Sequence, residues 1–260
     1  IYSLLLMKNS KHCLSLLLFF IILSASAEAD ENQKFLAFLE DEWQFELRQS
    51  PVYATAMGVK GYETLWRDDS LEAIEVRKSH NEDTINTLKG FKKRNLSKTN
   101  QLNLRLFTEL AKNELEIGQF NRHLLPFSHR GGIQLAHENA EVLPLKNSQD
   151  YRLWIERLKN LDKRIDQIIL LARLGLKESY KPPKVLMKRV DRQIDLQSRD
   201  NVDENPFFKI FISLPDSIPN DEKTALRTEA RKVIKEVVIP SYQLLGKYFK
   251  DEYLPQSRST

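Results

Sequence analysis

Residues 148–177 read SQDYRLWIERLKNLDKRIDQIILLARLGLK, and this stretch decides the fold class. Its apolar residues recur in steps of four and three, the spacing of one face of an α-helix. They are Trp154, Leu158, Leu161, Ile165, Ile168, Ala172 and Leu176. Ser148 and Asp150 are suited to cap the first turn. The stretch therefore predicts a central helix that packs along its whole length.

The same spacing recurs on both sides of this stretch, while glycine is scarce, with 8 in 260 residues. The period-two alternation of strands is nearly absent. We therefore predict an all-α protein: a bundle-like lobe of long antiparallel helices with short helical turns and one long loop. Further helices are expected at 31–48, 51–58, 71–93, 97–117, 182–199 and 219–251.

Three of these helices carry apolar stripes that predict burial. The first stripe contains Phe35, Leu39, Trp43 and Leu47. The helix capped by Ser97 has a broad face with Leu102, Leu106, Phe107, Leu110, Ala111, Leu115 and Ile117. The last helix continues one stripe across a kink at Pro240, through Leu226, Ala230, Val233, Val237, Ser241, Leu244 and Tyr248. The tryptophans Trp43, Trp66 and Trp154 are expected to anchor the core.

Between residues 124 and 147 the helical pattern is lost. This segment contains Pro126, Gly131, Gly132 and Pro144, and it is longer than an ordinary connection. We expect a long loop that is either functional or mobile.

The N-terminal residues resemble an export signal. Residues 1–6 precede Met7 and read as an upstream extension, and residues 7–27 combine basic, apolar and small-residue segments in the order of a cleavable signal peptide. The apolar core spans about ten residues, roughly half the length needed to cross a bilayer. We therefore expect cleavage near Ala27, a mature chain of residues 28–260, and a periplasmic or secreted location.

Composition excludes several classes of partner and site. Removing residues 1–27 takes away Lys8, Lys11 and the single cysteine, Cys13, which leaves a net charge of about +2. Charges of both signs are mixed along the helices, so we expect neither nucleic-acid binding nor membrane binding after signal removal. The mature chain has no thiol for a disulfide or a metal site.

The sequence contains no complete catalytic motif. His137 and Glu138, with Glu141 where a second histidine would stand, match half of a zincin motif, and we favour a solvated loop histidine over a metal ligand. Asp191 and Asp195 share a helical face with nearby arginines, which favours a surface salt-bridge lattice over acid–base chemistry. We assign no catalytic, cofactor-binding or metal-binding residue to this chain.

A series of short fragments, in order along the chain, resembles one family of bacterial helical proteins. The fragments are Ser50–Gly58, Gly132 with Gln134, Asp150-Tyr151, Arg157-Leu158, Asp166-Gln167-Ile168, Gly175, Pro182-Pro183 with Val185, Pro206-Phe207, Pro240-Ser241-Tyr242 and Glu252–Pro255 with Arg258. The family is the bacterial domain of unknown function 885, whose members are similar to helical zinc metallopeptidases.

This resemblance implies that a zinc motif of the form H-E-x-x-x-G-H lies beyond the last fragment, outside these 260 residues. The chain then resembles the N-terminal lobe of a larger exported zinc-dependent peptidase-like hydrolase, not catalytic alone, that forms part of a cleft for peptide substrates. The candidate cleft residues are Gly131, Gly132, Gln134, His137, Tyr253 and Arg258. The alternative is a non-catalytic periplasmic helical domain that binds peptides or a partner protein.

Overall fold

The computed structural model describes residues 30–259, which form helices joined by turns, with no strand among them. The prediction of an all-α protein is confirmed. The predicted signal peptide lies outside the described residues. A first helix occupies residues 30–49. The other α-helices are α2 (Pro51–Ala56), α3 (Leu71–Gly90), α4 (Lys98–Gly118), α5 (Asn139–Val142), α6 (Ser148–Leu158), α7 (Leu161–Lys177), α8 (Lys184–Gln197), α9 (Lys209–Ile212), α10 (Asn220–Val233), α11 (Ile239–Tyr248) and α12 (Leu254–Gln256).

Shorter helical segments connect these helices. The 3-10 segments are η1 (Lys93–Asn95), η2 (Arg122–Leu124), η3 (Ile133–Glu138), η4 (Val202–Glu204) and η5 (Pro206–Phe208). The wider π-helical turns are η6 (Ile234–Val238) and η7 (Phe249–Tyr253). Among the described helices, none has both the length and the apolar character needed to cross a membrane.

The chain folds into two compact units, each made of two stretches of sequence. Of the described residues, the first unit comprises 30–45 and 76–119, and the second comprises 46–75 and 120–259. Each unit has a hydrophobic core of its own.

The first unit closes around a small core to which the first helix, α3 and α4 all contribute. The ring of Phe35 is fully buried there and meets the edge of Phe91, with ring centroids 5.2 Å apart. Glu42 links the first helix to α3, since its carboxylate accepts a hydrogen bond from the Thr84 hydroxyl at 2.8 Å and lies 3.0 Å from the His80 ring nitrogen. Packing and polar links thus hold the same helices together.

Two predictions of burial in the first unit are wrong. Trp43 is 36% exposed and does not anchor the core. Helix α4 buries Leu104 and Ala111, with Phe107 and Leu115 beside them, but its other apolar face is open to solvent. That face carries Leu102, Leu106, Leu110 and Ile117, which are 45%, 53%, 62% and 36% exposed. Helical spacing identifies an apolar face, but it does not identify what covers that face.

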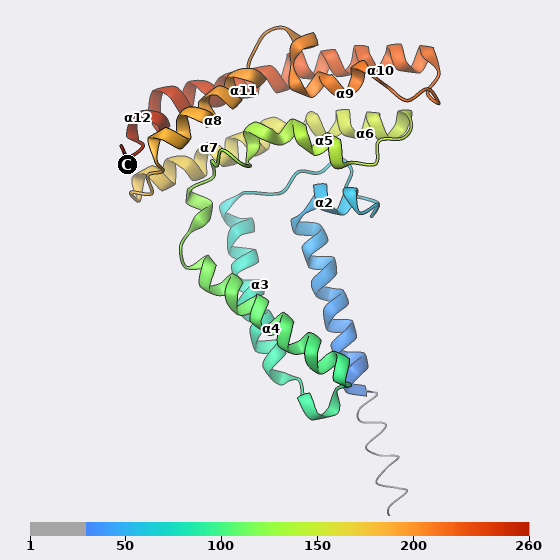
Figure 1. The fold of residues 1–260 in the computed structure, drawn as a ribbon, viewed down its shortest axis with the longest axis vertical. Helices are drawn as coiled ribbons and strands as arrows, with labels where there is room; N and C mark the ends of the chain where they lie inside the picture. Colours follow the sequence, from blue (N-terminus) through green and yellow to red (C-terminus); the bar gives the residue numbers. More distant parts are fainter. Residues whose placement is uncertain (1–29, 260) are drawn as a thin grey trace, which may run out of the picture. The chain divides into compact units, whose positions relative to one another are not determined.

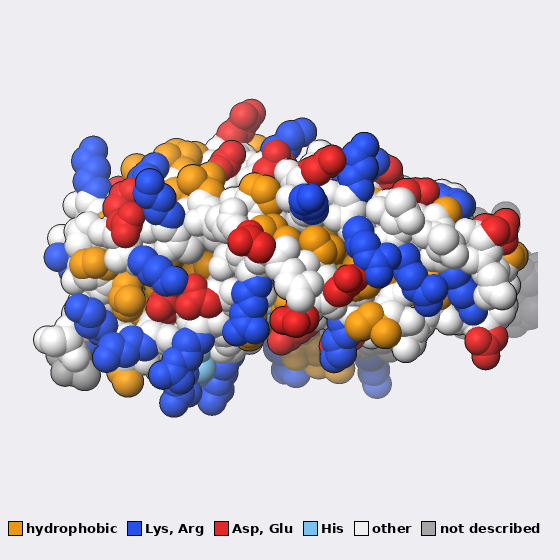
Figure 2. Space-filling model, turned by 90° about the horizontal axis from the view of Figure 1, so that it is seen from above, with side chains coloured by type: hydrophobic (Ala, Val, Ile, Leu, Met, Phe, Trp, Pro, Cys, Tyr) orange, Lys and Arg blue, Asp and Glu red, His pale blue; other side chains and the backbone are white. Residues whose placement is uncertain are grey.

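The second unit contains the large core, and its long helices lie in two layers (Figure 1). One layer consists of α6 and α7, and the other contains α8, α10 and α11. Helix α10 packs against α6, while α11 packs against both α7 and α8. Between the layers Trp154 stacks on Phe207 at 6.5 Å, and Tyr242 lies 5.8 Å from Phe207. On the face seen in Figure 2, basic and acidic side chains are interspersed.

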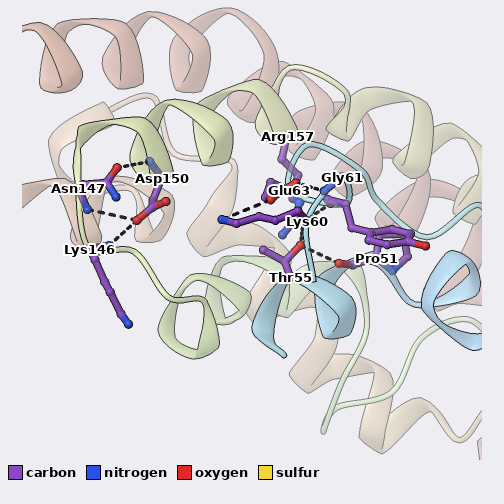
Figure 3. Close-up of polar contacts among 10 residues, drawn as sticks. Pro51, Thr55, Lys60, Gly61, Glu63, Lys146, Asn147, Asp150 and Arg157 are labelled. Carbon is purple, nitrogen blue, oxygen red and sulfur yellow. Dashed lines mark hydrogen bonds and ion pairs between the residues drawn. The ribbon is translucent and has the colours of Figure 1, made fainter. Parts of the chain in front are cut away.

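The stretch 148–177 forms two helices rather than one. Helix α6 ends at Leu158 and α7 begins at Leu161, so the predicted continuous helix is wrong, although all seven apolar residues of its stripe are buried. The N-cap is Asn147, whose side-chain oxygen accepts from the Asp150 N–H at 3.1 Å, while the Asp150 carboxylate accepts from the Asn147 N–H at 3.2 Å (Figure 3). Asp150 therefore caps the helix as predicted, in a capping box whose N-cap is Asn147 rather than Ser148.

The C-terminal helix runs on past Pro240, as predicted, but a change of phase accompanies the proline. Proline lacks an N–H, and its ring clashes with the carbonyl four residues earlier in a regular α-helix. The π-turns η6 and η7 lie immediately before the segments that contain Pro240 and Pro255. A π-turn adds one residue to the turn, and the fully buried residues are Val238, Tyr242, Leu245 and Phe249, while Ser241 and Tyr248 of the predicted stripe are also buried. Leu244, predicted to be buried, is 51% exposed.

The predicted long loop is largely ordered and packed. Residues 122–142 contain η2, η3 and α5, and Phe127, Ile133 and Ala136 are buried in the large core. The segment reads as a loop because short 3-10 turns lack the period of an α-helix. It forms part of the wall of the second unit.

Candidate functional site

Four of the candidate cleft residues lie at η3: Gly131 and Gly132 form the turn that leads into it, and Gln134 and His137 belong to it. Gly132 has φ +130°, and a Cβ there would lie 2.7 Å from the Oε1 atom of Gln134, so glycine is required. Gln134 is fully buried, and its Nε2 donates to the carbonyls of Ser128 at 2.7 Å and Gly131 at 3.2 Å. Its side chain therefore fixes the turn from inside.

Carboxamide side chains then connect η3 to α8. The Nε2 of Gln193 donates to the His129 carbonyl at 3.2 Å, and its Oε1 lies 3.3 Å from the Nε2 of Gln134. One turn further on, the Nε2 of Gln197 lies 2.9 Å from the Nδ1 of His137. With the amide as donor, Nδ1 accepts and the ring proton lies on Nε2. The network holds the imidazole in one orientation.

His137 is half-buried, and this burial lowers the pKa of its ring below the usual value, against the opposing effect of nearby Glu138 and Glu141. The ring is therefore neutral at neutral pH. A neutral imidazole can accept or donate a hydrogen bond without bringing a charge into the site.

His137 opens onto a surface pocket of about 470 Å³. Acidic side chains dominate its lining, with a single lysine among them. The lining residues are His137, Glu138, Glu141, Asp203, Glu204, Asn205, Pro206, Lys209 and Ile212. Both ends of the half-zincin pattern, His137 and Glu141, thus face the same pocket. The net negative charge of this lining favours a positively charged group as occupant.

The other two candidate residues have different surroundings. Tyr253 is fully buried, with its ring centroid 5.0 Å from that of Phe127 and 5.4 Å from that of Phe249, and burial raises the pKa of its hydroxyl. Arg258 is exposed, and its backbone pairs with the residues before α8: its N–H donates to the Pro182 carbonyl at 3.0 Å. Neither side chain lines the pocket beside His137.

A second hollow, of about 280 Å³, lies between α7 and the η6–α11 region. Its lining combines carboxylates with apolar side chains: Asp162, Ile165, Asp166, Glu236, Val237, Pro240, Ser241 and Leu244. Two of the fragments that carry the family resemblance, those containing Asp166 and Pro240-Ser241, meet here. Their separation in the sequence gave no sign that they share one surface.

Arg157 is a buried charged residue that the sequence analysis named only as part of the Arg157-Leu158 fragment, without a role. It is fully buried on α6, and its Nη2 donates to the Thr55 hydroxyl at 2.7 Å and to the Tyr62 carbonyl at 2.7 Å (Figure 3). Its guanidinium carbon lies 5.7 Å from the ring centroid of Trp66 and 5.9 Å from that of Trp154. Burial lowers the pKa of this guanidinium to about 10. Among the described residues, its Nε and Nη1 have no hydrogen-bond partner.

The segment 57–70 is held against α6 and α7 by further contacts from these helices. The indole N–H of Trp66 donates to the Arg157 carbonyl at 2.8 Å, and Arg164 forms an ion pair with Asp69 at 3.0 Å. The Oε1 of Gln167 accepts from the Asp69 N–H at 2.9 Å. The family-like fragments around Thr55 and Arg157 therefore have a clear role in holding this segment in place.

On α8, the basic partner of Asp195 differs from the arginines that were predicted. Asp195 pairs with Lys250 of η7 at 2.6 Å rather than with an arginine of its own helix. Burial, and to a lesser extent Asp195, raises the pKa of Asp191. Within residues 30–259, no three histidine, cysteine, aspartate or glutamate side chains converge as a metal ion would require.

Comparison with known proteins places this chain among bacterial proteins. The family model described as "Bacterial protein of unknown function (DUF885)" matches residues 51–260. A solved structure described as that of "the putative lipoprotein from Colwellia psychrerythraea" matches with a TM-score of 0.68 at 18% sequence identity. The match covers 88% of this chain and 42% of that chain. No curated protein matches.

Proposed function

This chain belongs to the DUF885 family of bacterial proteins, and we propose that it forms the N-terminal helical lobe of an exported zinc-dependent peptidase-like hydrolase. In this proposal the lobe lines part of the substrate cleft and carries no catalytic residue. The similar solved structure supports a larger whole, since this chain spans 42% of its length. That structure is described as a "putative lipoprotein", which supports export. The export signal in residues 7–27 is the basis for proposing cleavage near Ala27 and a periplasmic or secreted destination.

The observation that carries the binding role is the pocket beside His137. Its volume of about 470 Å³ falls within the roughly 300–1,000 Å³ typical of ligand pockets. Its wall is rigid because buried carboxamides tie His137 and the preceding turn to α8. A pre-formed wall costs little to order when a ligand binds.

The described residues of this chain do not supply a zinc site. The Nδ1 of His137 already faces the amide of Gln197 at 2.9 Å, and Glu141 stands where a zincin has its second histidine. The metal of the proposed hydrolase would therefore be held by residues outside this chain. What this lobe contributes is recognition.

The lining of the pocket indicates the substrate class. Asp203 is paired with Arg231 at 2.9 Å. The carboxylates of Glu138, Glu141 and Glu204 therefore create the negative potential that attracts the amino terminus of a peptide, or a lysine or arginine side chain. Ile212 offers an apolar surface to the methylene stem of such a side chain. We therefore propose peptides with a positive charge near one end as the ligands of this lobe.

A peptide-binding experiment tests the role of the pocket. A fluorescent lysine-containing pentapeptide should bind residues 28–260, and Glu138→Gln with Glu141→Gln should weaken binding at least about tenfold, since two of the attractive charges are lost. The matched control is Asp162→Asn with Asp166→Asn at the second hollow, which should leave the affinity unchanged. Equal losses in both double variants would refute the assignment of this pocket.

A non-catalytic peptide- or protein-binding domain is the second candidate, and the same acidic pocket supports it. The two candidates differ in whether the bound peptide is cleaved. Protein purified with the sequence downstream of residue 260 should cleave the peptide in a zinc-dependent manner if the hydrolase proposal holds. Binding without cleavage, together with the absence of an H-E-x-x-x-G-H motif downstream, would favour the second candidate.

A further inference from the structure

The exposed face of α4 is an apolar surface of the first unit. We propose that it pairs with the same face of a second copy of this chain, with the two α4 helices antiparallel. We define the α4 stripe as Leu102, Leu106, Leu110 and Ile117, the four apolar side chains left open to solvent.

The α4 stripe has the geometry of a helix-pairing seam. At 3.6 residues per turn, the four side chains fall within an arc of about 80° and extend along about 23 Å of the helix axis. The core face of the same helix, with Leu104 and Ala111, lies on the opposite side. The exposed seam is therefore separate from the packing that holds the first unit together.

The charges beside the stripe identify the partner. Arg105, Glu109, Lys112 and Glu116 line one edge of the stripe, and all four are exposed. Their signs alternate along the helix. Reversing the order of such a series exchanges the signs. A two-fold axis between antiparallel helices brings the same edge of both copies together, so an antiparallel copy places each charge opposite its complement, whereas in a parallel pair this edge would meet the opposite edge of the stripe.

The resulting pairs follow from one arrangement. If the two-fold axis passes near Leu110, Arg105 faces Glu116 of the second copy and Lys112 faces Glu109 of the second copy. Each pair occurs twice. Within one chain, Lys112 already lies 3.0 Å from Glu109, so both side chains extend along this edge. Antiparallel helices also bring opposite ends of their dipoles together.

A contact made by one helix from each copy is small, below the size of most stable dimer interfaces. We expect a dissociation constant on the order of 10 μM, which sedimentation equilibrium of residues 28–260 can measure. Leu106→Glu with Leu110→Glu should weaken the dimer at least about tenfold without changing the melting temperature of the monomer. Leu170→Glu, at a side chain 47% exposed on α7, is the matched control and should leave the dimer intact.

Charge exchange tests the partner and the edge together. Arg105→Glu with Lys112→Glu makes the edge wholly acidic, and Glu109→Lys with Glu116→Lys makes it wholly basic. Each double variant alone should be monomeric, and an equimolar mixture should form heterodimers. Self-association of either variant with the affinity of the parent chain would overturn the charge argument.

Orientation has its own test. Nitroxide labels on a cysteine in place of Lys98 should lie roughly 35 Å apart in the antiparallel dimer, but within about 15 Å in a parallel one. A monomer at millimolar concentration would overturn the proposal. A second result would also overturn it. If Leu106→Glu in a longer form of the protein lowered the melting temperature but left the molecular mass in solution unchanged, another segment of the same chain would cover the α4 stripe.

Discussion

The two units of this protein use the same kind of helix and differ in how completely they cover it. In the second unit, every apolar residue of the α6 and α7 stripe is buried. In the first unit, α4 has two apolar faces, and only one of them is covered. Amphipathic spacing is therefore a property of a helix, whereas burial is a property of its neighbours.

The largest expected difference between the units lies in their response to truncation of an apolar side chain. Trp154→Ala should lower the free energy of unfolding by about 3–5 kcal/mol, because it opens a cavity in the large core. Leu110→Ala, at a side chain 62% exposed, should change it by less than about 0.5 kcal/mol. Urea unfolding of both variants measures the contrast. Equal losses would show that the α4 stripe is covered after all.

Glycines sharpen the same comparison. A Cβ on Gly175 of α7 would lie 2.1 Å from the Leu124 carbonyl oxygen, which belongs to the backbone and cannot rotate away. Gly175→Ala should therefore cost about 2–3 kcal/mol in the second unit. Gly118→Ala in the first unit meets no atom within 4 Å and should be neutral or slightly stabilising. In thermal melts, Gly175→Ala should clearly lower the melting temperature, whereas Gly118→Ala should leave it unchanged or raise it slightly.

Helix caps provide a smaller contrast. Asn147→Ala removes a reciprocal capping box at the start of α6 and should cost about 1–2 kcal/mol. Ser97→Ala removes a single bond, from the Asn100 N–H at 3.2 Å, and should cost about 0.5–1 kcal/mol. Hydrogen exchange in the first turns of α6 and α4 can monitor each loss. A larger effect at Ser97 would contradict the ranking.

The smallest expected effect depends on pH. Because burial lowers the pKa of His137, the unfolded chain binds a proton at this position more readily than the folded chain. The stability contributed by the neutral ring is present above the unfolded pKa of about 6.5 and falls as the pH is lowered through the window below it. His137→Asn should remove this part of the slope between pH 7.5 and 5.5 in urea midpoints. An unchanged slope would show that other groups account for it.

The sequence predicted what depends on local periodicity. The helices, the buried stripe of residues 154–176 and the cap at Ser97 follow from spacing and side-chain type. The break at Lys159–Asn160 was not predictable, because Leu158 and Leu161 keep the stripe in phase across it. The role of Arg157 was equally hidden, since its partners Thr55 and Tyr62 lie about a hundred residues earlier, and only the fold brings them together.

The candidate site was predictable in part and for a similar reason. The glycine pair and Gln134 were candidate residues within the predicted long loop, and the structure shows why Gly132 is needed there. The acidic lining from Asp203 and Glu204 joins His137 through tertiary packing, which no local pattern records. Whether the six candidate residues contact a substrate stays a prediction.

The two π-turns before Pro240 and Pro255 reset which residues of the C-terminal helix face the core. Each extra residue rotates everything beyond it by about 100° relative to α10. Removing one residue from η6 would therefore turn Tyr242 and Phe249 away from the core, even though no aromatic side chain had been altered. In this helix, chain length is specified as strictly as residue type, and a single-residue deletion is expected to do more damage than most substitutions.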